Sequence, residues 1–497
     1  MKIRIASLML IILFYISAQS QVVKNDSLLL DQKLKYRIES NINISNGISS
    51  PLWSNANKQG LSSIKNNSAY ITVGIFKSMS PKVFSYSYGF ELVEAHNLAS
   101  DVILQQAYID LRYSGMQLSL GSKERYGEFA DPLLSSGELA FSGNAKPIPQ
   151  IRFEISNYIK IPYTRNWLSV RGHIAYGWFT DGVWQKSFVG DIGNRTSGVL
   201  YHSKAGYIKI ADPCNLLWRI ECGLEMFDQF GGTRYYSNGT QKKMRGGLND
   251  YLKALIPMAG GEKSPADDQA NIEGNMLGSY HFSFKYKLGN WDIHSYYEHY
   301  FEDQSMMWGK YPWKDGLVGL EIIFPKNRFM DKFVMEYFGS MNQSGPLYVE
   351  DKDGNEHLRI AGGDDYYNNG VYMSWAHYGM AMGNPLFMSP IYNKDHSMMF
   401  QSNRMTARHL GMSGNPINDL SYRILISYTR NWGRYNKLFT TDSGAYPSVK
   451  TDISTLYELT FSPHKLSGWS FVASAATDRG DMLGNNTGVM LTVRLKR

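Results

Sequence analysis

An alternation of apolar and polar residues with a period of two recurs through most of the chain and constrains its fold more than any other feature. In KVFSYSYGFEL (82–92), every second residue from Phe84 to Leu92 is large and apolar, and the residues between them are Ser, Gly or Glu. Such alternation is typical of β-strands with one apolar face. Comparable segments lie at 101–112, 115–123, 151–155, 168–178, 218–226, 280–288, 291–302, 317–324, 332–341, 421–430, 452–461, 468–476 and 489–495. No helical periodicity of any length competes with them, so the sequence predicts an all-β protein.

The faces opposite the apolar ones carry charges of both signs. Examples are Arg152 with Glu154, Arg219 with Glu221, and Glu225. A soluble sandwich also tolerates charge on its solvated face, so charge alone does not decide between the two architectures. The apolar faces, however, end in aromatic residues such as Trp178, Tyr428 and Trp469, as the interfacial girdles of membrane barrels do. At least a dozen strands also exceed one ordinary sandwich, and lipid requires a closed sheet without edges. We therefore expect a large antiparallel outer-membrane β-barrel whose charged faces line its lumen.

The N-terminal residues predict export. A basic head, MKIR, precedes the apolar run IASLMLIILFYIS and small residues up to Ser20, which is the build of a cleaved secretory signal peptide. We expect a signal peptide over 1–20, an N-terminal periplasmic segment over 21–68 and a transmembrane β-barrel over 69–497. Within the periplasmic segment, DSLLLDQKLKYRI (26–38) is compatible with a short helix. The expected location is the outer membrane of a Gram-negative bacterium.

Charge and loop composition limit the possible partners. The formal net charge of +7 is modest and no basic block stands out, so a nucleic-acid partner is not expected. Three long connections, 230–278, 341–370 and 376–420, are rich in Gly, Asn, Asp, Met and aromatic residues. Connections of this length in a compact body are usually functional.

No catalytic constellation accompanies these loops. The chain lacks an HExxH, a GxSxG and a Walker-type loop, and adjacent carboxylates such as Asp364 and Asp365 would point to opposite faces of a strand. We therefore expect no catalytic residues, no metal ligands and no cofactor. The expected protein is not an enzyme.

Several motifs in a fixed order resemble the Wzi-type capsule-assembly family, in its Bacteroidetes-like branch. They span nearly the whole mature chain: PLWSNANKQGLSS (51–63), SSGELAFSGNAKPIPQI (135–151), YYEHYFEDQSMM (296–307), GGDDYYNNGVYMSWAHYG (362–379), MGNPL (382–386), NRMTARHLG (403–411) and YTRNWGRY (428–435). The resemblance implies an outer-membrane barrel of about 16–18 strands, with long loops that occlude the outside and N-terminal helical material at the periplasmic end. It also implies a surface lectin without catalysis that binds or organises capsular or extracellular polysaccharide. Outer-membrane lipid and the barrel-assembly machinery are the other expected partners.

Candidate carbohydrate-binding residues follow from glycan chemistry. Sugars present C–H surfaces to aromatic rings, and their hydroxyl and acid groups to amides, carboxylates and Arg. The candidates, all in the expected loops, are Trp308, Tyr311, Trp313, Asp365, Tyr366, Tyr367, Asn368, Asn384, Arg404 and His409. The alternative for each is that it packs and hydrogen-bonds within loops that plug the barrel.

Two other functions remain open at this level. A porin or transporter for small solutes would use the same barrel with an open lumen, which the long loops and dense lumenal charge disfavour. A polysaccharide-modifying enzyme would need a well-placed pair of carboxylates, which the sequence does not offer.

Overall fold

The barrel contains eighteen strands in one closed sheet. The structure is a computed structural model, and it describes residues 34–78, 83–191, 193–214, 217–247, 250–251, 254, 274–302, 314–343, 364–441 and 447–497, with the backbone alone at 346–350 and 356–360. The barrel strands are β1 (Leu34–Asn46), β2 (Asn67–Lys77), β3 (Phe84–His96), β4 (Val102–Tyr113), β5 (Met116–Ser122), β6 (Gln150–Lys160), β7 (Leu168–Trp178), β9 (Leu200–Ala211), β10 (Trp218–Phe230), β13 (Asn275–Leu288), β14 (Trp291–Glu302), β15 (Gly316–Ile323), β16 (Lys332–Gly339), β23 (Met405–Ile417), β24 (Leu420–Asn431), β27 (Lys450–Phe461), β28 (Trp469–Gly480) and β29 (Asn486–Lys496).

Each barrel strand pairs antiparallel with its neighbours along the chain, and β1 closes the sheet by pairing with β29. At the closure Ile38 lies opposite Leu495, and Ile44 lies opposite Val489. This confirms the predicted antiparallel barrel, with a strand count at the upper end of the expected range.

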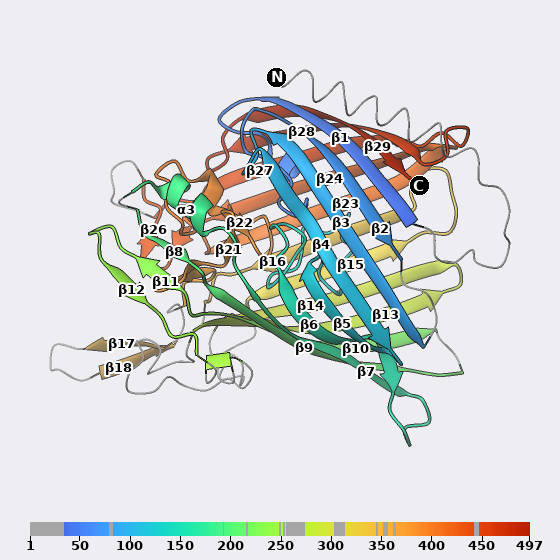
Figure 1. Cartoon of the computed structure of the whole chain (residues 1–497), viewed down its shortest axis with the longest axis horizontal. Helices are drawn as coiled ribbons and strands as arrows, with labels where there is room; N and C mark the ends of the chain where they lie inside the picture. Colours follow the sequence, from blue (N-terminus) through green and yellow to red (C-terminus); the bar gives the residue numbers. More distant parts are fainter. Residues whose placement is uncertain are drawn as a thin grey trace.

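The two ends of the barrel differ in their connections. At one end, turns of two residues join β4 to β5, β13 to β14 and β23 to β24, and both Ser114 and Gly115 of the first turn have positive φ. The C-terminus lies at this end, whereas the small strands and helix α3 (Gly182–Val189) gather at the other (Figure 1). Outer-membrane barrels have short periplasmic turns and longer extracellular loops. We therefore assign the end that carries α3 to the outside.

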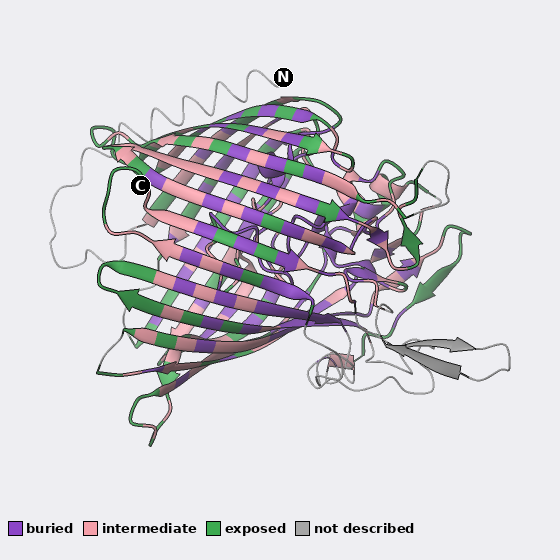
Figure 2. Cartoon of the chain, turned by 180° about the vertical axis from the view of Figure 1, so that it is seen from behind, coloured by how far each residue is buried: buried purple, intermediate pink, exposed green. Residues whose placement is uncertain are grey.

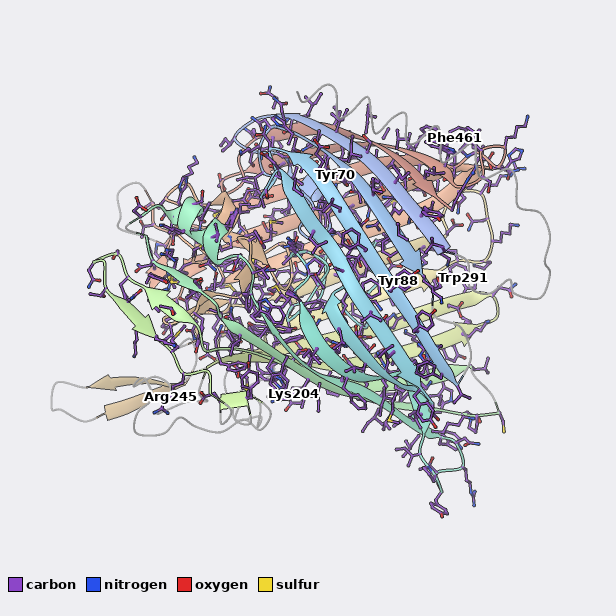
Figure 3. The ribbon with its side chains drawn as sticks, viewed as in Figure 1. Tyr70, Tyr88, Lys204, Arg245, Trp291 and Phe461 are labelled. Atoms are coloured by element: carbon purple, nitrogen blue, oxygen red, sulfur yellow. The ribbon has the colours of Figure 1, made fainter. Side chains whose placement is uncertain are left out.

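The alternation along the strands separates a lipid-facing surface from the lumen. Figure 2 shows buried residues alternating with more exposed ones along the wall. On β6, Ile151 and Phe153 are 57% and 49% exposed, whereas Arg152 and Glu154 face inward and form an ion pair of 2.5 Å. Trp291 and Phe461 lie at the periplasmic end, far from Arg245 (Figure 3). The charged faces therefore line the lumen, as the sequence predicted.

Short strands and helices lie in the segments that connect the barrel strands at the extracellular end. The small strands are β8 (Arg195–Ser197), β11 (Thr233–Tyr235), β12 (Gln241–Lys243), β17 (Pro346–Glu350), β18 (Glu356–Ile360), β19 (Asn368–Asn369), β20 (Met373–Ser374), β21 (Ala376–His377), β22 (Met380–Ala381), β25 (Gly433–Arg434) and β26 (Lys437–Leu438). The helical elements besides α3 are α2 (Leu52–Asn55) and η1 (Pro390–Tyr392). Among the described residues, no helix combines the length and apolar character that crossing a bilayer requires.

Three predicted boundaries need correction. The barrel begins at Leu34, not at residue 69, because β1 pairs with both β2 and β29 and is required to close the sheet. The predicted helix over 26–38 is a strand from Leu34 onward, and its first part lies outside the described residues, as does the predicted signal peptide. The predicted loop 376–420 also contains a wall strand, β23.

The main apolar core lies inside the barrel. Three segments that leave the wall at its extracellular end, 47–66, 123–149 and 364–404, fold into the lumen, and together we call them the plug. Its apolar side chains, such as Trp53, Leu139 and Trp375, pack in one cluster with the wall residues Phe227 and Phe338. The occluding loops that the sequence predicted are therefore a packed domain within the barrel.

Candidate functional site

Carboxylates on the wall bind the backbone of the plug. Glu336 on β16 accepts hydrogen bonds from the Ser136 amide at 2.8 Å and the Ser135 hydroxyl at 2.5 Å. Glu298 on β14 accepts from the amides of Leu139 and Ala140 at 2.6 and 3.0 Å. Unpaired amides buried away from water are costly, so these carboxylates replace the partners that secondary structure would supply. The motif SSGELA is thus fixed to the wall at both ends.

The tyrosines of DDYYNN lie at the centre of the plug. Tyr366 and Tyr367 are each 1% exposed, and both rings pack edge-on against Tyr300 of β14. The Tyr367 amide donates to Glu302 at 2.6 Å, and its hydroxyl donates to the Leu139 carbonyl. In this structure neither ring presents a face to the outside.

Three further candidates also bond inside the barrel. Asn368 exchanges hydrogen bonds with the Phe400 backbone at 2.8 and 3.0 Å, and the Asn384 side chain donates to the Ser136 hydroxyl at 3.0 Å. His409 lies on β23, where its Nε2 donates to the Leu134 carbonyl at 2.8 Å. These contacts correspond to the packing alternative that the sequence left open.

Two candidates lie nearer the extracellular rim. Asp365 pairs with Arg434, whose Nε lies 3.1 Å from the carboxylate, and accepts from the Asn403 amide group. Arg404 stands over the ring of Tyr435 at 5.4 Å, and its Nε has no hydrogen-bond partner. We call Asp365, Arg404, Arg434 and Tyr435 the rim cluster. The sequence singled out YTRNWGRY as a motif but did not select Arg434 or Tyr435 from it.

The remaining candidates, Trp308, Tyr311 and Trp313, lie outside the described residues. They stay a prediction from the sequence.

A row of stacked aromatic rings on the extracellular loops was not predicted. Trp184 and Phe188, one helical turn apart on α3, stack at 4.8 Å with 12° between their planes, and Phe188 stacks on His396 at 5.1 Å. Tyr378 lies 6.1 Å from Trp184. We call these four residues the aromatic row. Its sequence signal was weak, because VWQKSF (183–188) is short and the partners of α3 are about 200 residues away.

Buried polar groups hold the aromatic row in place. The Asp181 carboxylate accepts from the Tyr378 amide at 3.0 Å, and the Nε2 of His377 accepts from the Thr180 amide at 3.2 Å. Burial lowers the pKa of His377, so this ring is neutral and can accept that bond. Gly379 has positive φ, and a Cβ there would lie 2.4 Å from the Trp184 ring.

Three lysines lie near the aromatic row. The Lys146 ammonium lies 4.9 Å from the centre of the Tyr378 ring, and burial lowers the pKa of Lys146. Lys186 and Lys394 are exposed beside α3 and His396. Rings with partly exposed faces next to ammonium groups suit a ligand that carries both C–H surfaces and acid or hydroxyl groups.

Two cavities lie between the plug and the wall. One, of about 330 Å³, is lined by Arg125, Arg152 and Glu225, and the other, of about 510 Å³, is lined by Lys58 and Arg423. Burial, reinforced by the Arg152 charge, lowers the pKa of Arg125 to about 10, and burial lowers the pKa of Lys58 to about 8. The lumen is therefore divided into polar, charged compartments.

Comparison with known proteins identifies the family. The family model described as capsule assembly protein Wzi matches residues 54–388, a range that includes 123–149 and most of the other two plug segments. No curated protein matches the chain in sequence.

Solved structures share the barrel. Wzi from Escherichia coli, described as an outer membrane protein involved in group 1 capsule assembly and as a carbohydrate-binding β-barrel, matches with a TM-score of 0.54 and 12% identity, over 92% of this chain and 84% of that chain. OprD and OccK5 from Pseudomonas aeruginosa match at 9% identity with TM-scores of 0.45 and 0.46, covering 95% of this chain and 97% and 99% of theirs. At 12% identity, the match to Wzi of Escherichia coli establishes the fold alone. Because the family model matches well over half of the residues, this outer-membrane barrel belongs to the Wzi family of capsule assembly proteins.

Proposed function

We propose that this protein binds capsular or extracellular polysaccharide at the cell surface and contacts it through the aromatic row. The observation that carries the proposal is the stacking of Trp184, Phe188 and His396 on loops of the extracellular end. Membership of a capsule assembly family supports a polysaccharide as the ligand, and so does the carbohydrate binding described for Wzi of Escherichia coli.

The chemistry of the aromatic row fits a sugar chain. Ring faces accommodate the C–H surfaces of pyranose rings, and the neighbouring ammonium groups of Lys146, Lys186 and Lys394 can pair with acidic substituents. In the rim cluster, the Arg404 guanidinium lies over the Tyr435 ring and so combines a cation with an aromatic side chain. We propose the rim cluster, together with the predicted loop that carries Trp308, Tyr311 and Trp313, as further contacts along an extended chain.

The proposed role is binding without catalysis. The acidic side chains of the plug and wall described above are engaged by backbone amides, hydroxyls or Arg, as Glu298, Glu336 and Asp365 are. Outer-membrane lipid is the proposed partner of the exposed apolar faces, and the barrel-assembly machinery that of the unfolded chain.

Binding of the purified barrel to the polysaccharide of its own cell tests the proposal. The double variant Trp184→Ala/Phe188→Ala removes two stacked rings, each worth on the order of 1 kcal/mol, so the affinity should fall by about 10-fold or more. Tyr163→Ala is the matched control, because Tyr163 is fully exposed on the periplasmic turn between β6 and β7.

Calorimetry or a glycan pull-down measures the affinity, and the shift in gel mobility on boiling reports the folded barrel. If the double variant folds and binds like the parent and like Tyr163→Ala, the aromatic row is not the binding site. A parallel Arg404→Ala variant then tests the rim cluster separately.

A further inference from the structure

Three side chains with metal-ligating atoms meet where the plug touches the wall. Glu138 comes from the plug, Glu225 from β10 and His281 from β13, and they are 3%, 4% and 1% exposed. One ligating atom of each lies within 4.8 Å of the other two. The Oε2 atom of Glu225 is 3.6 Å from His281 Nε2, and the Oε2 atom of Glu138 is 4.0 Å from His281 Nδ1. Among the described residues, this is the only group of three such side chains.

In both glutamates the carboxylate oxygen Oε1 already accepts hydrogen bonds, and these bonds orient the other oxygen, Oε2. Glu138 Oε1 accepts from the amides of Phe129 and Ala130 at 2.7 and 3.0 Å, and Glu225 Oε1 accepts from the Tyr207 hydroxyl. Both Oε2 atoms therefore point toward the imidazole. Ligating groups in metal sites are typically oriented by a second partner in this way.

Two of the atoms that face one another in this group are buried without a hydrogen-bond partner. Glu138 Oε2 and His281 Nε2 have no hydrogen-bond partner, although both residues are almost completely buried. The separations of 3.6 and 4.0 Å are those of ion pairs and are longer than ordinary hydrogen bonds, so the contacts within the group are loose in this geometry. Other buried polar atoms of the described residues also lack partners, but these two face ligating atoms of the same group, where a single ion or water would bridge them.

The imidazole is held rigidly. Its ring stacks on Phe129 at 4.7 Å with 7° between the planes. A second lumenal histidine shows the contrast, because both nitrogens of His294 are bonded, Nδ1 to Glu321 at 3.1 Å and Nε2 to Ser283 at 2.9 Å. Both ring nitrogens of His294 are therefore hydrogen-bonded, whereas Nε2 of His281 is not.

We propose that Glu138, Glu225 and His281 bind one divalent transition-metal ion and that this ion fastens the plug to the barrel wall. Two carboxylates and one imidazole form a ligand set suited to Zn²⁺ or Mn²⁺, and the two negative charges balance the ion. Small rotations of the two carboxylates would bring one oxygen of each, together with one imidazole nitrogen, to metal–ligand distances of about 2.0–2.3 Å. Glu225 also lines the cavity of about 330 Å³, which gives the ion a polar route of entry.

Metal content of the folded, detergent-solubilised full-length protein tests this proposal. After chelator treatment, the protein is equilibrated with Zn²⁺, Mn²⁺ or Co²⁺, washed and analysed by elemental mass spectrometry, with the visible absorption of Co²⁺ as a report of its ligands. We expect one tightly held ion per chain and a higher unfolding temperature with metal than with EDTA. Loss of groups that merely orient ligands weakens metal sites by about 10–100-fold, so removing a ligand should do at least as much.

The variants are Glu138→Gln, Glu225→Gln and His281→Gln, and His294→Gln is the matched control because it removes a buried histidine whose nitrogens are already bonded. Glu138→Gln keeps the acceptor for the Phe129 and Ala130 amides, and gel mobility with and without boiling reports its folding. Loss of the ion in the three variants but not in the control supports the site. No bound ion in the parent, or unchanged binding in folded Glu138→Gln, overturns the proposal.

Discussion

At the scale of single residues, the lumenal carboxylates explain why charged faces recur along the chain. Glu298, Glu302 and Glu336 each accept from at least one backbone amide of the plug. A carboxylate presents up to four acceptor positions and so satisfies donors that an irregular segment cannot pair internally. Inward-facing glutamates are therefore the means by which a lipid-facing barrel holds an irregular polar segment inside.

Glu336→Gln is expected to loosen the plug and leave the barrel intact. The Gln amide group would replace one acceptor oxygen with a donor that faces the Ser136 amide or the hydroxyls of Ser135 and Tyr296, at a cost of about 1–3 kcal/mol. Hydrogen exchange over 133–140 should accelerate by about 5-fold or more. Glu221→Gln is the control, since Glu221 faces the lumen but bonds Tyr158 and Arg219 of the wall. Equal protection in both variants would contradict this account.

At the scale of elements, alternation identified most of the barrel strands but missed β1, β9 and β23. β1 alternates, with Tyr36, Ile42 and Ile44 exposed, but was assigned to the N-terminal segment. On β9 and β23 the alternation itself is interrupted. The outer face of β9 carries His202 and Lys204 near the extracellular end, where the Lys204 ammonium donates to the Ala254 carbonyl at 2.6 Å. On β23 the inward residues Met405 and Ala407 pack against the apolar plug. Both faces of these strands then hold mixed side chains, and the period of two is lost.

The candidate site shows the same limit. Three motifs that the sequence singled out, SSGELA, DDYYNN and MGNPL, meet inside the barrel, where they pack as the alternative interpretation expected. They did not distinguish Tyr367, which is buried, from exposed aromatic residues, because tyrosine serves packing and binding equally well. Contacts such as Trp184 with Tyr378 join segments about 200 residues apart and have no local signal.

The assignment of faces leads to a prediction on β10. Leu224 lies near the middle of this strand and faces outward, between the inward, buried Glu221 and Glu225. Leu224→Arg should cost about 2–4 kcal/mol near the bilayer midplane and reduce the yield in the outer membrane, whereas Leu224→Phe should be tolerated. Urea unfolding in liposomes measures the cost. Normal yield and stability of Leu224→Arg would mean that the face is not in contact with lipid.

At the scale of the whole molecule, the barrel is a wall built around a second folded body. The plug contributes Trp53, Leu139, Tyr367 and Trp375 to the main apolar core, and apolar side chains of the barrel wall complete this core. The two cavities, of about 330 and 510 Å³, lie between the plug and the wall. This arrangement separates a binding barrel from a porin of the same size, in which the lumen would be the functional part.

The plugged lumen predicts that the protein does not conduct steadily in planar bilayers. A variant that replaces residues 369–399 with a short Gly/Ser linker should conduct, because it removes much of the plug's apolar core, including Trp375 and Phe387. The linker can be short since the ends are adjacent: the Phe400 amide donates to the Asn368 side chain at 2.8 Å. Gel mobility with and without boiling confirms that the shortened chain still closes its barrel. Stable, porin-like openings in the parent would show that the plug leaves a path for ions, and solute transport would then replace glycan binding as the leading function.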